Sequence, residues 1–194
     1  MKCDIILAGV GGQGVLSISS IIAASALKEG LCVKQSEVHG MAQRGGAVQS
    51  NLRLGDQPIQ SDIVSLGSAD MILSMEPLES LRYLDYLSPQ GCVITSTEPF
   101  ENIPDYPEVS EILAKIHALP KARTLEAVRI ARQAGSARAS NMVVVGAASK
   151  LVPIKSATIE TCIREAFAKK GDKVVETNIA AFKAGREAIQ WDAK

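Results

Sequence analysis

Residues 4–14 read DIILAGVGGQG, and this stretch decides the fold. An apolar run of strand length enters a glycine cluster, and an apolar pattern with helical spacing follows it. Gly9, Gly11 and Gly14 have the G-x-G-x-x-G spacing of a strand–turn–helix unit. The pattern therefore predicts an α/β fold that begins with a strand, a glycine turn and a helix.

Each glycine of such a turn has an expected role. The first permits the tight turn, the second lets another group approach the backbone, and the third lets helix and strand pack closely. The free N–H groups at the helix start then form an anion site. The cofactor-binding candidates are Gly9, Gly11, Gly12, Gln13 and Gly14. A turn that packs tightly and binds nothing is the alternative, because short motifs also occur without a ligand.

Composition restricts the class of protein. The 194 residues suit one domain over 1–194, and 46% hydrophobic with 22% charged residues is typical of a globular protein. The balance of 21 basic and 21 acidic residues argues against nucleic acid or an anionic membrane as partner. No apolar run reaches the ~18 residues of a membrane span, and the start lacks a signal-peptide pattern. We therefore expect a cytoplasmic protein.

The four cysteines are scattered along the chain. Cys3, Cys32, Cys92 and Cys162 form no C-x-x-C or other closely spaced ligand group. We therefore expect no iron–sulfur cluster or zinc site within this chain. A disulfide framework is not expected in a cytoplasmic α/β domain.

Strands and helices alternate through the first half of the chain. The expected strands are 4–9, 31–35, 48–54, 69–74 and 92–95, with helices from the glycine turn to about residue 29 and over 77–87. Residues 89–91 are expected to form a turn. This alternation predicts a mostly parallel sheet with helices on both faces, a Rossmann-like architecture.

The second half is predicted to be rich in helix. A proline-containing linker over 96–108 leads to expected helices at 109–117, 125–133, 156–167 and 175–191. Residues 142–145 are ambiguous, since their β-branched content favours a strand. We predict a helix there, because Asn141 is a good N-cap and apolar residues recur at helical spacing.

A second cluster follows the second expected strand, where residues 37–46 read EVHGMAQRGG. A dinucleotide-binding domain places an acid for the ribose near this point, and Glu37 roughly suits that role. A long loop rich in glycine and polar residues is instead typical of a contact with a ligand or partner. Its candidate residues are Glu37, His39, Met41, Gln43, Arg44, Gly45 and Gly46. The alternative is an ordered surface loop whose glycines serve only its turns.

Together, the two motifs resemble the gamma subunit or domain of 2-oxoacid:ferredoxin oxidoreductases. Within this family, the chain is most similar to the small beta subunit of the indolepyruvate-type enzymes. The C-terminal pattern Asn178-x-x-Ala181-Phe182-x-x-Gly185 is also similar to the family's ending. The resemblance covers essentially the whole chain.

The resemblance implies a complex that oxidatively decarboxylates a 2-oxoacid to an acyl-CoA and reduces ferredoxin. Thiamine diphosphate and [4Fe-4S] clusters would be held by a large catalytic subunit, with this chain as a non-catalytic partner that is inactive alone. The gamma domain of related enzymes contributes to the coenzyme A region, which would suit a glycine-rich helix start facing phosphates. No residue of this chain is expected to be catalytic or to bind a metal.

Three other readings of the sequence remain open. A stand-alone NAD-dependent dehydrogenase would use Glu37, but the chain offers no convincing catalytic pair. An ATP-dependent adenylating enzyme also uses a G-x-G-G-x-G turn, but usually adds basic ATP contacts and cysteine pairs. A scaffold would use the glycine turn only for packing. Titration of the purified chain with NAD, ATP and coenzyme A separates the binding classes.

Overall fold

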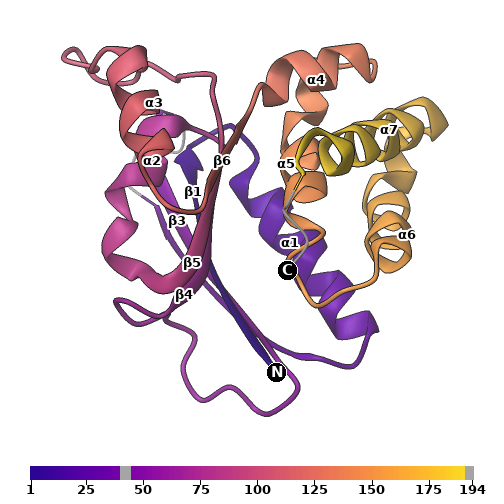
Figure 1. Ribbon diagram of the computed structural model, residues 1–194. Coiled ribbons are helices and arrows are strands. Elements are labelled where there is room, and N and C mark those ends of the chain that lie inside the picture. Colours follow the sequence, from indigo (N-terminus) through magenta and orange to yellow (C-terminus); the bar gives the residue numbers. More distant parts are fainter. Residues whose placement is uncertain (40–44, 191–194) are drawn as a thin grey trace.

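A mixed six-stranded sheet forms the centre of the computed structural model, which describes residues 1–39 and 45–190 (Figure 1). The strands are β1 (Lys2–Val10), β2 (Cys32–His39), β3 (Ala47–Gly55), β4 (Ala69–Ser74), β5 (Leu87–Ser96) and β6 (Ala122–Leu125). Their order is β2-β3-β1-β4-β5-β6, so β1 is central. The pairs β1–β4, β4–β5 and β5–β6 are parallel, and β3 runs antiparallel to both neighbours. The predicted α/β fold with a mostly parallel sheet is confirmed.

Helices cover both faces of this sheet (Figure 1). They are α1 (Val15–Lys28), α2 (Pro77–Arg82), α3 (Val109–His117), α4 (Ala127–Gln133), α5 (Ser140–Ala148), α6 (Ser156–Phe167) and α7 (Asp172–Ala188). Single turns of 3₁₀-helix occupy Leu84–Tyr86, Ala137–Ala139 and Ala168–Lys170. α2 and α3 lie on one face, whereas α1 and α4 to α7 form a layer on the other (Figure 1). The expected helix-rich C-terminal part therefore packs back on the sheet.

β1 supplies buried side chains to both layers. Ile5 and Leu7 belong to the larger apolar cluster, which includes residues of α1, α5 and α7. Ile6 belongs to a smaller cluster on the opposite face, together with Ile72 and Val93. This division follows from the two-residue period of a strand. A central strand buried on both faces explains why the opening of the sequence is a nearly continuous apolar run.

The predicted helix over 142–145 is confirmed as part of α5. Every residue from Asn141 to Ala148 is buried, so the helix is covered on all sides and shows no periodic stripe. Its N-cap is Ala139, whereas Asn141 lies inside the first turn. The N-cap assignment of Asn141 was therefore wrong, because the preceding 3₁₀ turn starts the helix earlier.

The segment before β5 differs from the sequence-based expectation. The helix predicted over 77–87 ends at Arg82, and β5 begins at Leu87, so residues 89–91 are strand rather than a turn. The strand accommodates them through a register shift, since Ala69 pairs with Leu87 but Met71 pairs with Cys92. Pairing with β4 extends this strand beyond its apolar part, and a local pattern cannot reveal such pairing.

The edge strand β6 was missed. Its four residues pair in parallel with the end of β5, and three of them are only half-buried. A short edge strand of this kind has no clear alternation. The helix predicted over 125–133 therefore begins two residues later, at Ala127.

Candidate ligand site at the carboxyl edge of the sheet

The glycine turn lies at the carboxyl end of β1, beside the carboxyl end of its parallel neighbour β4. The helix after β1 covers one face of the sheet, and the helix after β4 covers the other (Figure 1). Open α/β sheets bind ligands at such a switch point, because the two diverging connections leave a crevice between them. The fold thus puts the first sequence motif where this class of protein binds its ligands.

The start of α1 is suited to an anion. Its N-cap is Gly14, at φ 83°, which provides no side-chain cap, and the first turn holds no acidic residue. A β-carbon added to Gly12 would meet no protein atom of the described chain within 4 Å. Uncapped N–H groups beside open space can donate hydrogen bonds to phosphate oxygens. The described residues of the turn therefore fit a phosphate-bearing group such as that of coenzyme A.

Two glycines of the motif are required by close packing, although not in the predicted roles. A β-carbon on Gly9 would lie 2.8 Å from Cγ2 of Val15 and 3.2 Å from Cβ of Met75. One on Gly14 would lie 2.8 Å from Nδ2 of Asn141 in α5. The first glycine thus permits the strand–helix contact that we had assigned to the third. The third instead permits a contact between two helices that are far apart in sequence.

Gln13 holds the turn in place. Its Oε1 accepts a hydrogen bond from the backbone N–H of Val10 at 2.8 Å. Its Nε2 donates to the carbonyl oxygen of Met75 at 3.4 Å, just beyond the end of β4. The side chain therefore connects the two strands that border the switch point. Both polar ends are used within the protein, which favours the bracing role of Gln13 over ligand binding.

The end of the second motif reaches the glycine turn. The N–H of Gly11 donates to the carbonyl oxygen of Gly46 at 2.8 Å, and the N–H of Gly45 donates to that of Gly11 at 3.2 Å. Asn102, from the segment after β5, donates from Nδ2 to the carbonyl oxygen of Gly45 at 2.7 Å. Two motifs that are separate in the sequence, at 4–14 and 37–46, thus meet through their described residues. Asn102 was missed because a lone Asn in a proline-containing segment carries no pattern.

Part of the predicted loop belongs to a strand. Glu37 and His39 lie in β2, where they pair with Ser50 and Val48 of β3. The expectation that these two are loop residues was wrong, because pairing with β3 extends β2 past its apolar part. Glu37 is exposed, and its carboxylate accepts a hydrogen bond from Nε2 of Gln35. Met41, Gln43 and Arg44 lie outside the described residues.

A buried acid that we did not single out follows β4. Glu76 is 1% exposed and is the N-cap of α2, with Oε2 accepting from the N–H of Glu79 at 2.7 Å. Its Oε1 accepts from the hydroxyl of Tyr106. Burial and this hydrogen bond raise the pKa of the Tyr106 hydroxyl. Because both carboxylate oxygens have partners, Glu76 anchors the segment after β5 to α2. Its position directly before Pro77 was the available signal.

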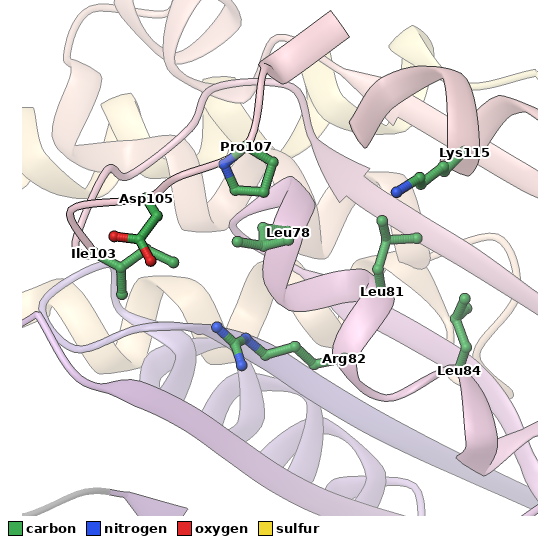
Figure 2. A pocket seen from close by; sticks show the side chains of 8 residues that line it. All are labelled: Leu78, Leu81, Arg82, Leu84, Ile103, Asp105, Pro107 and Lys115. Carbon is green, nitrogen blue, oxygen red and sulfur yellow. The ribbon is translucent and has the colours of Figure 1, made fainter. Parts of the chain in front are cut away.

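A groove lies beside α2, and Figure 2 shows the side chains that line it. It has a volume of about 660 Å³ and is lined mainly by Leu78, Leu81 and Leu84, with Ile103 and Pro107 contributed by the linker. No candidate residue from the sequence lines it. Its walls also include the charged residues Arg82, Asp105 and Lys115, but no residue of the glycine turn. The groove is therefore not part of the candidate ligand site.

Two negative findings concern the described part of the chain. No group of three or more His, Cys, Asp or Glu side chains there could hold a metal ion. No helix there is long and apolar enough to cross a membrane.

The fold defines an α/β protein with a glycine turn at the carboxyl edge of its sheet, and comparison with known proteins gives the family. Residues 4–188 match the model of the pyruvate ferredoxin/flavodoxin oxidoreductase family. The chain is 37% identical to the indolepyruvate oxidoreductase subunit IorB of Archaeoglobus fulgidus, over 95% of this chain and 94% of that one. The chain therefore belongs to this family, as a gamma-type subunit of a 2-oxoacid:ferredoxin oxidoreductase.

Solved structures agree with this fold. The pyruvate oxidoreductase subunit PORC of Thermotoga maritima superimposes with a TM-score of 0.76 at 21% identity, covering 97% of both chains. The 2-oxoglutarate:ferredoxin oxidoreductase of Magnetococcus marinus, with 2-oxoglutarate, coenzyme A and succinyl-CoA bound, gives a TM-score of 0.76 at 23% identity. That match covers 96% of this chain but 31% of the other, so the present chain corresponds to one part of a longer polypeptide.

Proposed function

We propose that this chain is the small, gamma-type subunit of an oxidoreductase that acts on indolepyruvate and related aryl pyruvates. The complex would oxidatively decarboxylate the 2-oxoacid to an acyl-CoA and reduce ferredoxin. The support is the whole-length similarity to an indolepyruvate oxidoreductase subunit. The large partner subunit would carry thiamine diphosphate and [4Fe-4S] clusters.

We further propose that the glycine turn and the segment 37–46 contribute to the coenzyme A region of that complex. The observation that carries this proposal is the pair of backbone hydrogen bonds between Gly11 and the Gly45–Gly46 turn. It joins the uncapped start of α1 to the end of the polar segment. Bound coenzyme A would supply the thiol that accepts the acyl group. The N–H groups of Gly12 and Gly14 would hold its phosphates, and Arg44 would add a cation.

The substrate class can be tested with the assembled complex. The chain is produced together with its large subunit, and coenzyme A-dependent reduction of ferredoxin is measured with four 2-oxoacids. We expect kcat/KM for indolepyruvate and phenylpyruvate to exceed that for pyruvate and 2-oxoglutarate by at least about tenfold, or about 1.4 kcal/mol. A preference for pyruvate or 2-oxoglutarate would contradict the aryl-pyruvate assignment while leaving the family membership intact.

The coenzyme A role is tested with Arg44→Ala in the same complex. The apparent KM for coenzyme A should rise about tenfold, because a charge-assisted contact to phosphate contributes on the order of 1.5–3 kcal/mol. The KM for the 2-oxoacid and the melting temperature of the chain should change little. Arg132→Ala is the matched control, because Arg132 is exposed on α4. Equal effects of the two changes, or unfolding by Arg44→Ala alone, would reject the proposed contact.

Calorimetry distinguishes the proposed subunit from the two alternative functions, an NAD-dependent dehydrogenase and an ATP-dependent adenylating enzyme. Binding of NAD or ATP with micromolar Kd, in the absence of coenzyme A binding to the complex, would favour a dehydrogenase or an adenylating enzyme. Coenzyme A binding to the complex, without micromolar binding of NAD or ATP to the chain, supports the proposal.

A further inference from the structure

A polar pocket of about 480 Å³ lies in the helical layer, beside the start of α1. None of the residues from Gly9 to Gly14 lines it. Its walls come from the first turn of α1, the 3₁₀ turn before α5, the first turn of α5, and the end of α6 together with α7. A pocket of this volume has the size of a small-molecule site.

The pocket carries an unbalanced positive charge. Arg138, Lys170 and Lys173 all line it, and no Asp or Glu does so among the described residues. Ion pairs of these three side chains are absent from the described part of the chain, where Lys170 instead lies 5.1 Å from the ring centroid of Phe167. The neighbouring acid in the first turn of α7, Asp172, is exposed and lies outside the lining. Three cations without a carboxylate among them attract an anion.

Three helix starts meet at this pocket. Ser17 of α1, Asn141 of α5 and Lys173 of α7 line it, each from the first turn of its helix. The N-caps of these helices are Gly14, Ala139 and Gly171, and none forms a side-chain cap hydrogen bond. Each helix start adds a partial positive charge, and α1 and α7, which begin at glycines, add free N–H donors. Backbone and side chains therefore favour the same sign of ligand charge.

A buried amide supplies an independent observation. Asn141 is 8% exposed and lines the pocket. Its Oδ1 accepts from the N–H of Met142 at 3.0 Å. Its Nδ2 makes no hydrogen bond to any other described residue. Because Asn141 lines the pocket and its Nδ2 has no partner in the described protein, this donor is available to an acceptor group of a ligand.

We propose that this pocket binds a phosphate-bearing small molecule, at a site separate from the glycine turn. Arg138, Lys170 and Lys173 would pair with phosphate oxygens, and Nδ2 of Asn141 would donate to one of them. A phosphate group suits several converging donors because it offers three or more strong acceptor oxygens. The proposal does not depend on the coenzyme A role of the glycine turn.

A ligand bound in this pocket would also restrain the glycine turn. The Nδ2 atom proposed to bind the ligand is the atom that a β-carbon on Gly14 would meet at 2.8 Å. A ligand that fixes Asn141 thereby restrains the N-cap of α1. The pocket is thus placed to couple the helical layer to the carboxyl edge of the sheet.

The test is calorimetric titration of the full purified chain with pyrophosphate and with ADP at constant ionic strength. We expect binding at submillimolar to millimolar Kd, weakened at least about tenfold by Arg138→Ala and by Lys173→Ala. Lys169→Ala is the matched control, since Lys169 is exposed, removes the same charge and does not line the pocket. It should leave Kd within about twofold. Equal affinity for the two probes identifies a diphosphate site, and tighter ADP binding identifies a nucleotide site.

A second variant tests the amide donor of Asn141 directly. Asn141→Asp keeps the shape of the side chain but replaces the free donor with a carboxylate, so probe binding should be abolished. Arg44→Ala should leave binding unchanged, which separates this site from the proposed coenzyme A contact. No detectable binding at about 10 mM probe would overturn the proposal. So would equal weakening by Lys169→Ala, or glutarate binding as tightly as pyrophosphate.

Discussion

Gly146 of α5 lies directly against the backbone of Phe182 in α7. A β-carbon built on Gly146 would overlap the carbonyl oxygen of Phe182, and one built on Gly185 would overlap that of Val143. The two helices therefore cross backbone to backbone, with a glycine from each at the crossing point. This contact gives a structural reason for the Phe182-x-x-Gly185 part of the C-terminal pattern, since only glycine leaves room for such an approach.

Adding a methyl group at this crossing should destabilise the chain strongly. Gly146→Ala and Gly185→Ala should each lower the free energy of unfolding by about 3 kcal/mol or more, because the clash is with backbone that cannot rotate away. Urea denaturation followed by circular dichroism measures the change. Ala180→Ser is the control, since it adds one heavy atom on the exposed side of α7 and should stay within about 0.5 kcal/mol. A glycine variant as stable as this control would show that the helices can separate freely.

The carboxylate of Asp4, fully buried in β1, has two cationic partners of unequal exposure. Arg53 holds both of its oxygens, from Nε at 2.9 Å and from an Nη at 3.1 Å. Nζ of Lys2 lies 2.8 Å from Oδ2, and the Lys2 side chain is 52% exposed. Arg53→Met should therefore lower stability by about 3 kcal/mol, whereas Lys2→Met should cost less than about 1 kcal/mol. Comparable losses in urea titrations of the two variants would refute the assigned difference.

Two buried thiols should make stability fall at alkaline pH. The pKa of Cys3 is raised to about 12 and that of Cys92 to about 11, from an ordinary 9.0. Burial is the main cause of both shifts. Above pH 9 the unfolded chain loses these protons first, so it binds fewer protons than the folded chain. The free energy of unfolding then decreases as pH rises, from pH 9 toward the folded pKa values of about 11 and 12.

This dependence is measured by urea denaturation at pH steps between 8 and about 11. Cys3→Ala and Cys92→Ala should each reduce the slope of stability against pH in this range. Cys32→Ala controls for the loss of a less buried thiol and should retain the slope of the unmodified chain. An unchanged slope in the Cys3 and Cys92 variants would show that other groups cause the alkaline loss.

Gln13→Ala should loosen the glycine turn locally. It removes the acceptor of the Val10 N–H and the donor to Met75, at an expected cost of about 1–3 kcal/mol. Amide hydrogen exchange of Val10 should accelerate more than that of residues inside α1. Leu16→Ala, on the partly exposed side of the same helix, should leave Val10 exchange unchanged. Unaltered Val10 protection in Gln13→Ala would show that the turn holds without this side chain.

Local pattern was sufficient for several elements. The ranges 69–74, 109–117 and 156–167 were predicted with the bounds that the structure has. Each of these segments has a clear apolar period or a good boundary residue, and its neighbours in sequence set its conformation. The family resemblance likewise rested on two glycine-rich motifs that can be read along the chain.

Pairing between distant segments decided the strand bounds and contacts that the sequence did not predict. β2 and β5 are longer than expected and β6 was missed, because hydrogen bonding to a neighbouring strand extends a strand past its apolar part. For the same reason, Glu37 and His39 were assigned to a loop. The partner of Gly14 was also hidden, because Asn141 lies in another helix.

The sequence by itself determined the α/β class, the glycine turn and the family, because each motif or element on which they rest is a pattern of about a dozen consecutive residues or fewer. Only the tertiary structure decided which segments meet. It joined Gly11 to Gly46 at the sheet edge and gathered Ser17, Arg138, Asn141 and Lys173 around one pocket. No spacing in the chain encodes such a gathering, because it arises when separate helices bury their apolar sides against the same sheet and bring their starts together.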